Sequence, residues 1–258
     1  MRNDRLRPLA DPVDDDDSVA LEELGFTASA QQVAGVLRQG VPALEGASGS
    51  RFNRSFNRSF DRSFDRFLPD ELRIVSGQHW TPLVVALRVA EWLDGLGVRR
   101  VVDLGSGAGK FCVAAAIASS CQFTGIEQRP HLVHAARALA RSFAVEDRVR
   151  FIVGTLGQLE IPDADAYYLY NPFGENLFGP EGHVDDVVEL SEERYMRDTS
   201  LVERFLKHAP VGTYVVKYNG FGGIMPGTYK PIRIDHGMPN VLRLWRKTSS
   251  YREAQAST

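Results

Sequence analysis

A glycine-rich turn between a short apolar run and a helix of small residues is the feature that most restricts how this chain folds. The run RRVVDLG (99–105) leads into SGAG (106–109), and KFCVAAAIASS (110–120) follows. The run is typical of a buried strand, and glycines let the backbone turn sharply and come close to a ligand. The segment therefore predicts a strand, a ligand-binding turn and a helix, in that order.

Strands and helices alternate along much of the remaining chain. The predicted strands are 99–105, 121–127, 148–154, 166–171, 213–219 and two within 228–247, and the predicted helices are 79–97, 109–120, 129–145 and 191–209. Such alternation indicates the α/β class, with a Rossmann-like, doubly wound and mostly parallel sheet. We expect a seven-stranded sheet whose last two strands form an antiparallel closing hairpin.

Composition divides the chain into three parts. We expect an N-terminal extension (1–70), the α/β domain (71–248) and a C-terminal tail (249–258). The first 20 residues are polar and include an acidic run at 14–17, so they offer little apolar surface to offset the cost of ordering. The extension is therefore predicted to be helical or partly disordered.

The extension contains the repeat RFNRSFNRSFDRSFDRF (51–67), whose four-residue unit is Ser-Phe-Asn/Asp-Arg. In a helix, a four-residue period drifts by about 40° per unit, so the phenylalanines form a slowly winding stripe beside a basic one. One interpretation is an aromatic and basic arm that grips substrate or nucleic acid. The favoured interpretation is a helix that packs on the core or stays partly disordered.

Charge and cysteine content argue against several classes of protein. The 258 residues carry a formal net charge of -3, which gives no overall attraction to nucleic acid, so a dedicated duplex-DNA binder is not expected. The two cysteines lie outside any disulfide or metal-binding spacing, and His131 and His134 lack a third ligand. No apolar stretch is long enough for a membrane helix. We therefore expect a soluble, cytoplasmic protein without a metal or a membrane partner.

Acidic residues end the first two predicted strands. Asp103 precedes the glycines, and Glu127 ends the second strand, 18 positions after Gly109. Open parallel sheets bind ligands at the carboxyl ends of their strands, where an acid can accept hydrogen bonds from both ribose hydroxyls. The pair predicts a nucleotide-containing cofactor and fits NAD as well. A P-loop is excluded because Lys110 is followed by Phe111 instead of Ser or Thr.

The turn DLGSGAG (103–109) resembles the D/E-x-G-x-G-x-G signature of class I S-adenosylmethionine-dependent methyltransferases. The closing hairpin is also characteristic of that family. The resemblance implies that the acid lies near the amino-acid portion of S-adenosylmethionine and that the glycines pass beneath it. The segment SGQHWTPLVV (76–85) resembles one in some adenine-N6 methyltransferases that touches the methionine end. The implied cofactor-binding residues are Thr81, Asp103, Gly105, Ser106, Gly107, Gly109, Glu127, Gln128 and Leu156.

Two of these assignments have alternatives. Thr81 precedes Pro82 and is also suited to cap the following helix. Members of the resembled family often place an acid after the third strand to meet the adenine amine. This chain has GTLG (154–157) there, so backbone groups near Leu156 are the candidates for that contact.

After the fourth predicted strand, Asn171-Pro172-Phe173 resembles the Asn/Asp-Pro-Pro-Phe/Tyr motif of methyltransferases that act on amino groups in DNA, RNA or protein glutamine. In that family the Asn oxygen and a proline carbonyl accept hydrogen bonds from the target nitrogen, and the ring stacks on its planar group. One proline of the motif is missing here. Glu175 offers another role, because it suits proton transfer or the binding of a cationic lysine or small amine. A simple turn that leaves the strand is a third interpretation.

Together these features predict an S-adenosylmethionine-dependent methyltransferase that acts on a nitrogen of a protein, a nucleic acid or a small metabolite. A partial likeness to non-SET lysine methyltransferases, through DLGSG and the strand-end Glu127, fits the same class. Two alternatives share part of the pattern. One is a nicotinamide-dependent oxidoreductase, which uses similar glycines, and the other is a methyltransferase-like binding module whose repeat docks a partner.

Overall fold

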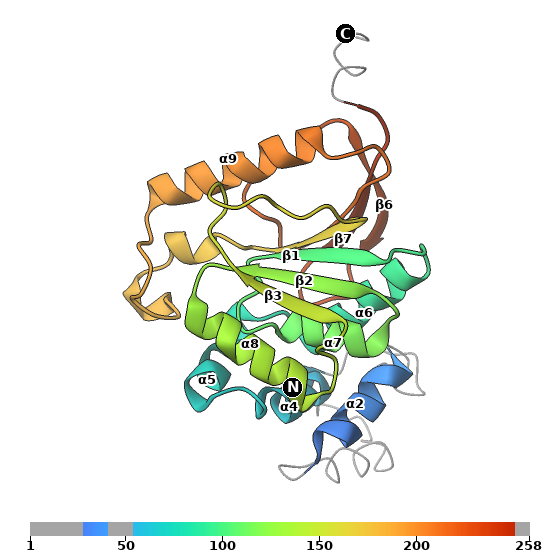
Figure 1. The fold of residues 1–258 in the computed structure, drawn as a ribbon, viewed down its shortest axis with the longest axis vertical. Helices are drawn as coiled ribbons and strands as arrows, with labels where there is room; N and C mark the ends of the chain where they lie inside the picture. Colours follow the sequence, from blue (N-terminus) through green and yellow to red (C-terminus); the bar gives the residue numbers. More distant parts are fainter. Residues whose placement is uncertain (1–27, 41–53, 251–258) are drawn as a thin grey trace, which may run out of the picture.

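The computed structural model describes residues 28–40 and 54–250, in which a seven-stranded sheet forms the centre of the fold (Figure 1). The strand order is β3-β2-β1-β4-β5-β7-β6. Neighbouring strands from β3 to β5 are parallel, whereas β7 is antiparallel to β5 and β6. The predicted doubly wound sheet with a closing hairpin is confirmed. Its strands are β1 (Arg100–Leu104), β2 (Gln122–Glu127), β3 (Val149–Val153), β4 (Ala166–Tyr170), β5 (Tyr214–Tyr218), β6 (Tyr229–Asp235) and β7 (Leu242–Lys247).

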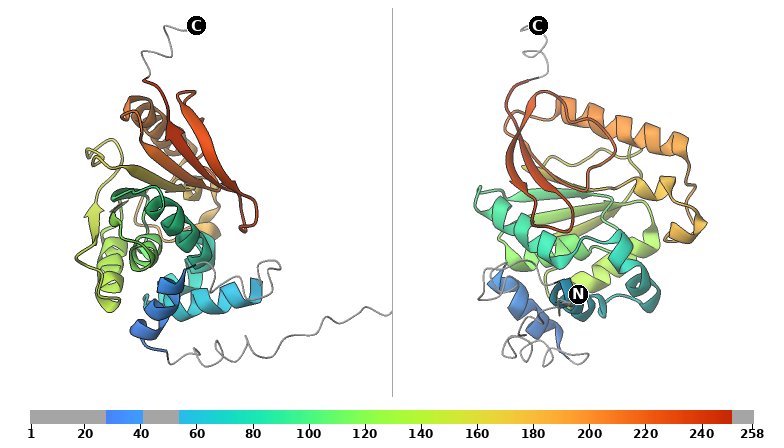
Figure 2. Two further views of the ribbon diagram at one scale, coloured as in Figure 1. Left: turned by 90° about the vertical axis from the view of Figure 1, so that its right-hand side faces the viewer. Right: turned by 180° about the vertical axis from the view of Figure 1, so that it is seen from behind.

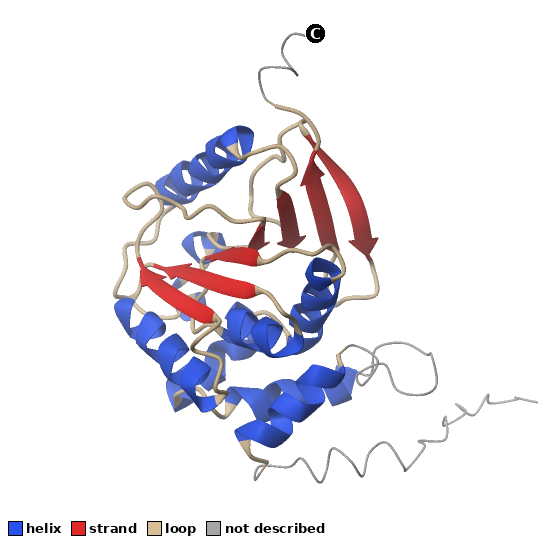
Figure 3. Cartoon of the chain, turned by 45° about the vertical axis from the view of Figure 1, so that its right-hand side comes forward, coloured by secondary structure: helices blue, strands red, loops and turns tan. Residues whose placement is uncertain are grey.

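Helices cover both faces of the sheet (Figure 3). One face carries α6 (Leu83–Asp94), α7 (Lys110–Ala118) and α8 (Pro130–Ser142), and α9 (Glu192–His208) lies across the other. The central strand β1 is apolar on both sides, as a strand covered twice must be. Val101 packs with the residues of α6 to α8, whereas Val102 packs with those of α9.

The strand order reverses between β1 and β4. The chain passes from β1 outward to β2 and β3 and then returns to β4 on the other side of β1. In open α/β sheets ligands bind beyond the carboxyl ends of the strands at such a reversal. The fold thus places the glycine turn after β1 and the Asn-Pro-Phe turn after β4 at the same edge.

The single helix predicted over residues 79–97 is wrong at its start. The structure has two helices there, α5 (Asp70–His79) and α6, separated by Trp80 to Pro82. Trp80 is extended, with φ -102° and ψ 146°. A proline disfavours helical geometry in the residue before it, so Pro82 forces Thr81 out of the helix and starts α6 afterwards.

The described part of the N-terminal extension consists of helices that pack on the domain. Helix α2 (Ala30–Gln39) lies where helices were expected and begins with a capping box between Ser29 and Gln32. Helix α4 (Arg54–Asp65) contains the last units of the repeat. Both lie on the outer side of the helical layer formed by α6 to α8 (Figure 2).

Two phenylalanines of the repeat enter the core. Phe60 and Phe64 are almost fully buried, and Phe64 stacks on Phe143, with ring centroids 4.7 Å apart. For these units the structure agrees with the packing interpretation and not with a free arm. The acidic run at 14–17 and the start of the repeat lie outside the described residues. Within 28–40 and 54–250, no helix is long and apolar enough to cross a membrane.

Candidate functional site

The turn after β1 has a backbone that only glycine adopts easily. Gly105, Gly107 and Gly109 have φ values of 82°, 53° and 80°. The amides of Gly105 and Ser106 both donate to the carbonyl oxygen of Ile126, at 2.9 Å, which joins the turn to β2. A Cβ on Gly107 would come within 2.2 Å of the Trp80 ring, so this position has no room for a side chain.

The two predicted acids beside this turn are both buried. Burial raises the pKa of Asp103 to about 7, and among the described residues its carboxylate accepts one hydrogen bond, from Cys112 Sγ at 3.5 Å. The Glu127 carboxylate accepts from the amides of Gly107, at 3.0 Å, and Arg129, at 2.9 Å. Burial also raises the pKa of Glu127. Glu127 therefore fixes the turn while one side of its carboxylate borders the cavity.

One cavity of about 190 Å³ brings most of the predicted site residues together. The predicted cofactor residues that line it are Gly105, Gly107, Glu127, Gln128 and Leu156, and the predicted acceptor residues are Asn171, Pro172, Phe173 and Glu175. Three others, Thr81, Asp103 and Ser106, line a small adjoining pocket of about 20 Å³. Gly109 lines neither cavity and packs against Phe151. A Cβ on Gly105 would lie 3.0 Å from Pro172 Cβ, so the two turns touch.

Thr81 faces the small pocket and does not cap α6. Its hydroxyl lies 3.0 Å from the hydroxyl of Tyr168, and both residues are buried. The first free amide of α6, on Leu83, instead donates to Asp61 Oδ1 at 3.0 Å. The cap is supplied by the repeat helix, a partner that a local pattern does not reveal.

Helix α9 borders the side of the cavity that contains Thr155 and Leu156. Arg194 donates a hydrogen bond to the side chain of Gln128, and its Nε lies 3.4 Å from Asp198 Oδ2. Both α9 residues line the cavity together with Thr155 and Leu156. Polar side chains of α9 therefore lie beside the loop at residues 154–157, which contains no acidic residue.

Sequence reasoning did not assign a role to Lys110, the first residue of α7. Its side chain is only 3% exposed, and Nζ lies 2.7 Å from Asp61 Oδ1 and 2.8 Å from Asp65 Oδ1. Ser76 Oγ is 3.3 Å from the same nitrogen. Burial alone would lower the pKa of Lys110, but the two carboxylates outweigh it and raise the pKa. A lone lysine in an otherwise apolar helix was the available signal.

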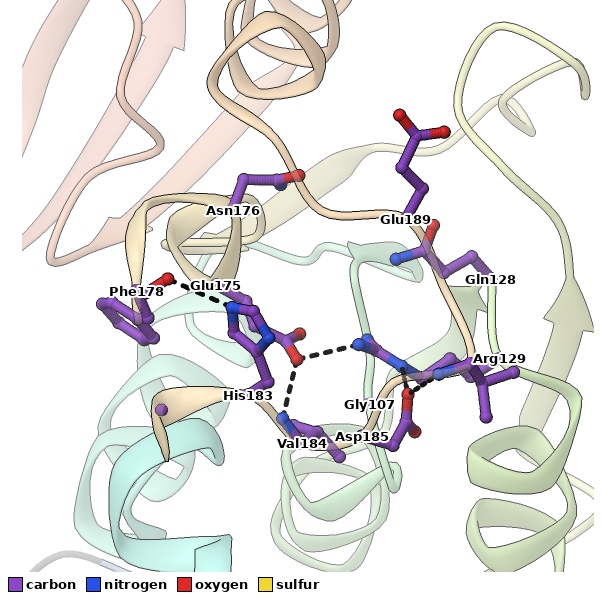
Figure 4. A network of polar contacts seen from close by, with 12 residues as sticks. Gly107, Gln128, Arg129, Glu175, Asn176, Phe178, His183, Val184, Asp185 and Glu189 are labelled. Carbon is purple, nitrogen blue, oxygen red and sulfur yellow. Dashed lines mark hydrogen bonds and ion pairs between the residues drawn. The ribbon is translucent and has the colours of Figure 1, made fainter. Parts of the chain in front are cut away.

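A second buried cation follows Glu127 and was also missed. Arg129 donates to Glu175 Oε1 at 2.8 Å and to Asp185 Oδ1 at 2.9 Å (Figure 4). Glu175 also accepts from the amide of Val184, and Asp185 lies 3.0 Å from His131 Nε2. The segment after Phe173 is therefore fastened to the turn after β2. We call residues 174–190 the acceptor segment; it includes the short helices η1 (Gly174–Leu177) and η2 (Pro180–Gly182).

The unpredicted residues that line the main cavity include two polar side chains, those of His79 and Asn219. His79, at the end of α5, has a pKa lowered chiefly by burial, which favours the neutral imidazole. Asn219 follows β5 and has a left-handed backbone, with φ 54°. In the described part of the chain, no group of three or more His, Cys, Asp or Glu side chains is arranged to hold a metal ion.

Comparison with known proteins gives one family match. Residues 98–168, from the start of β1 into β4, match the sequence model of a family described as methyltransferase domain. Among curated proteins, no sequence matches the chain.

Several solved structures are similar to the chain. An RNA methyltransferase from Salinibacter ruber in complex with S-adenosyl-L-homocysteine has 24% identity, with 65% of this chain and 91% of that chain covered and a TM-score of 0.46. TrmN from Thermus thermophilus has 16% identity, with 73% and 53% covered and a TM-score of 0.49. A putative O-methyltransferase from Klebsiella pneumoniae has 14% identity, with 72% and 90% covered and a TM-score of 0.48.

Proposed function

We propose that this chain is a class I S-adenosylmethionine-dependent methyltransferase and that it transfers the methyl group to a nitrogen atom held beside Asn171. The observation that carries the proposal is the single cavity shared by the glycine turn, Glu127 and the Asn171-Pro172-Phe173 turn. Cofactor and acceptor groups must meet within a few ångströms for methyl transfer, and this cavity allows them to do so.

The residues around the cavity suit S-adenosylmethionine. The glycine turn has no side chains where the ligand passes, and Gly107 has the Trp80 ring packed on its other side. Glu127 presents a carboxylate that suits the ribose hydroxyls. Asp103 suits the ammonium group of the methionine portion, because a positive partner would offset the burial of its carboxylate. We assign Thr81, Ser106, Gln128 and Leu156 to the remaining contacts.

Catalysis in this arrangement depends on orientation. When bound, the cofactor supplies a methyl group on a positively charged sulfonium; a C–N bond forms as the S–C bond breaks, leaving a neutral thioether and one proton. Asn171 Oδ1 accepts a hydrogen bond from the acceptor nitrogen and so directs its lone pair. Phe173, which is buried at the cavity wall, supports the planar part of the acceptor. Pro172 holds the turn against Gly105.

The proton that leaves the nitrogen has two side chains within reach of the cavity. Glu175 already pairs with Arg129, so proton transfer by Glu175 requires that ion pair to break. His79 lines the same cavity, and burial lowers its pKa and so favours the neutral imidazole, the form that can accept a proton. We therefore propose His79 as the proton acceptor, with Glu175 holding the acceptor segment in place.

Ligand-induced thermal stabilisation tests the cofactor. S-adenosylhomocysteine at about 100 times its Kd is expected to stabilise the fold by roughly 2.7 kcal/mol, which raises the melting temperature. NAD at the same concentration is the control for the oxidoreductase alternative. Stabilisation by NAD alone would overturn the proposed function.

Transfer of labelled methyl groups tests the acceptor. Purified protein is incubated with cell extract and methyl-labelled S-adenosylmethionine, and the label is then followed into protein, nucleic acid and small molecules. Label that enters one fraction with wild type and not with Asp103→Ala, provided that the variant remains folded, supports catalysis. Absence of label from all three fractions would favour the binding-module alternative.

A further inference from the structure

Two neighbouring strands end in the same pair of residues. β4 ends at Tyr170, followed by Asn171, and β5 ends at Tyr218, followed by Asn219. Tyr170 and Tyr218 are register partners in the parallel ladder, and their ring centroids lie 4.8 Å apart. Because parallel strands in register carry successive residues forward together, both asparagines leave the sheet at the same edge.

Both asparagines also share an uncommon backbone conformation. Asn171 has φ 40° and Asn219 has φ 54°, and among the described residues the one other non-glycine residue with positive φ is Ala144. Left-handed geometry is costly for residues other than glycine, and such residues gather at functional sites. The amide of Asn171 donates to the carbonyl of Gly220 at 2.9 Å, so the two turns are joined directly.

The side chains of this pair are free to bind a ligand. Both residues line the cavity that contains the glycine turn and Glu127. Within residues 28–40 and 54–250, neither carboxamide has a hydrogen-bond partner. The Asn171 carboxamide lies directly over Gly174, where a Cβ would come within 2.0 Å of Nδ2. The site therefore offers two unused amide oxygens, one from each strand.

We propose that Asn219 is a second acceptor-binding residue and that the acceptor is a primary amino group on a planar molecule or side chain. This proposal rests on the methyl-transfer function proposed above. A primary amine has two N–H donors, and the two asparagine oxygens accept one each, which leaves the nitrogen lone pair for the methyl carbon. One proline of the Asn-Pro-Pro-Phe/Tyr motif is absent here, and the Asn219 oxygen would serve as the second hydrogen-bond acceptor. The paired rings of Tyr170 and Tyr218 directly precede the two asparagines.

Sinefungin provides a probe that does not require the natural acceptor, because it carries a primary amine where the sulfonium methyl group of the cofactor would be. Its amine points to the place at which the acceptor nitrogen arrives. Wild type is expected to bind sinefungin about tenfold more tightly than S-adenosylhomocysteine, since a hydrogen bond to a charged amine is worth about 1.5–3 kcal/mol. Isothermal titration calorimetry measures both dissociation constants.

Glycine substitution separates the two roles that an asparagine can have here. Asn219→Gly keeps the left-handed backbone and removes the carboxamide, so the fold should be retained. The preference for sinefungin is expected to fall about tenfold, with the Kd for S-adenosylhomocysteine unchanged within about twofold. Ala144→Gly, at the left-handed residue outside the cavity, is the matched control and should leave the preference as in wild type.

Each outcome points to a different conclusion. An unchanged preference in Asn219→Gly overturns the role of Asn219, even if both ligands bind. Failure of both ligands to bind folded wild type overturns the proposed methyl-transfer function instead. Loss of S-adenosylhomocysteine binding in Asn219→Gly would show a cofactor-site effect and would also overturn the acceptor role.

Discussion

Two buried cations lie beside the cavity at the carboxyl edge of the sheet, and they are held in different ways. Lys110 follows the glycine turn and pairs with two carboxylates of α4, while Arg129 follows Glu127 and pairs with two carboxylates of the acceptor segment. Both cations are only 3% exposed. Each therefore joins a turn that follows a central strand to a segment that is distant in the sequence.

The two attached segments differ in what else holds them. Helix α4 has its own helical hydrogen bonds and two buried phenylalanines, Phe60 and Phe64. The acceptor segment has short 3-10 helices and exposed apolar side chains, such as Leu177 at 54% and Val187 at 64%. The Arg129 ion pairs thus account for a larger share of that segment's attachment. We therefore expect loss of Lys110 to lower the free energy of unfolding most. Loss of Arg129 should chiefly reduce the order of the acceptor segment.

The largest expected effect is the loss of stability in Lys110→Met. Removal of the ammonium leaves Asp61 and Asp65 without their buried partner, which typically costs about 3–5 kcal/mol. Urea denaturation measures the change, and Lys230→Met, at an exposed position, is the control. Adding Asp61→Asn and Asp65→Asn should recover part of the loss. A loss below about 1 kcal/mol would contradict a tightly held ion triad.

Arg129→Met should destabilise the protein less, by about 1–3 kcal/mol, because Glu175 and Asp185 can turn towards water. Its larger effect should be local. Hydrogen exchange is expected to increase in residues 174–190 and to stay unchanged in α7. Arg141→Met, at an exposed position of α8, is the control. Equal increases in hydrogen exchange in residues 174–190 and in α7 would contradict a mainly local role for Arg129.

The pH dependence of cofactor binding tests a feature that the two networks share: neither cation pairs with Asp103. Burial raises the pKa of Asp103 to about 7, so the carboxyl gains a proton as the pH falls below that value. Below about pH 7, the affinity for S-adenosylhomocysteine should rise with pH, by up to about tenfold per pH unit. Above about pH 7 it should level off.

The sign for stability is opposite. A carboxyl whose folded pKa is raised makes the free protein lose stability as the pH rises from the unfolded value towards 7. Asp103→Asn should remove both effects. Calorimetric titrations measure the affinity and urea denaturation measures the stability, each from about pH 5.5 to about pH 8.5, a range that spans the pKa. If the affinity or the stability of Asp103→Asn changed with pH as it does in wild type, the titrating group would be another residue.

The smallest expected effect is that of Asp185→Asn, which removes one of the two Arg129 carboxylates and the contact with His131. Since Glu175 still pairs with Arg129, the cost should be about 0.5–1 kcal/mol. Exchange in the acceptor segment should rise less than in Arg129→Met. Asp186→Asn, at the exposed neighbouring position, provides the comparison. An effect as large as that of Arg129→Met would mean that Asp185 alone holds the segment.

Local patterns predicted the parts of the fold that depend on local interactions. The strand, turn and helix around DLGSGAG could be predicted because glycine conformation and apolar runs are properties of a few consecutive residues. The doubly wound, mostly parallel sheet and its closing hairpin followed from the alternation and the family resemblance, whereas the strand order came from the structure. The break at Pro82 was missed because the apolar pattern continues on both sides of it.

The partners of the buried cations could not be predicted in the same way. Asp65 and Lys110 are 45 positions apart, and Arg129 and Glu175 are 46 apart, so no spacing rule relates them. Asn219 could have been noticed, because AYYLYN and TYVVKYN end alike. Its meaning depends on the pairing of β4 with β5, which only the structure provides.

The contacts of α4 also bear on how the repeat can change in evolution. Tandem units are gained and lost by replication slippage, and the four units here carry Asn53, Asn57, Asp61 and Asp65 in turn. Within the described part of the repeat, the two aspartate units contact Lys110. Extra copies inserted before Asn57 would lengthen the helix away from the lysine, whereas deletion of an aspartate copy would leave a buried positive charge underneutralised. The number of repeat units is therefore free to change before Asn57 and constrained at the aspartate units that pair with Lys110.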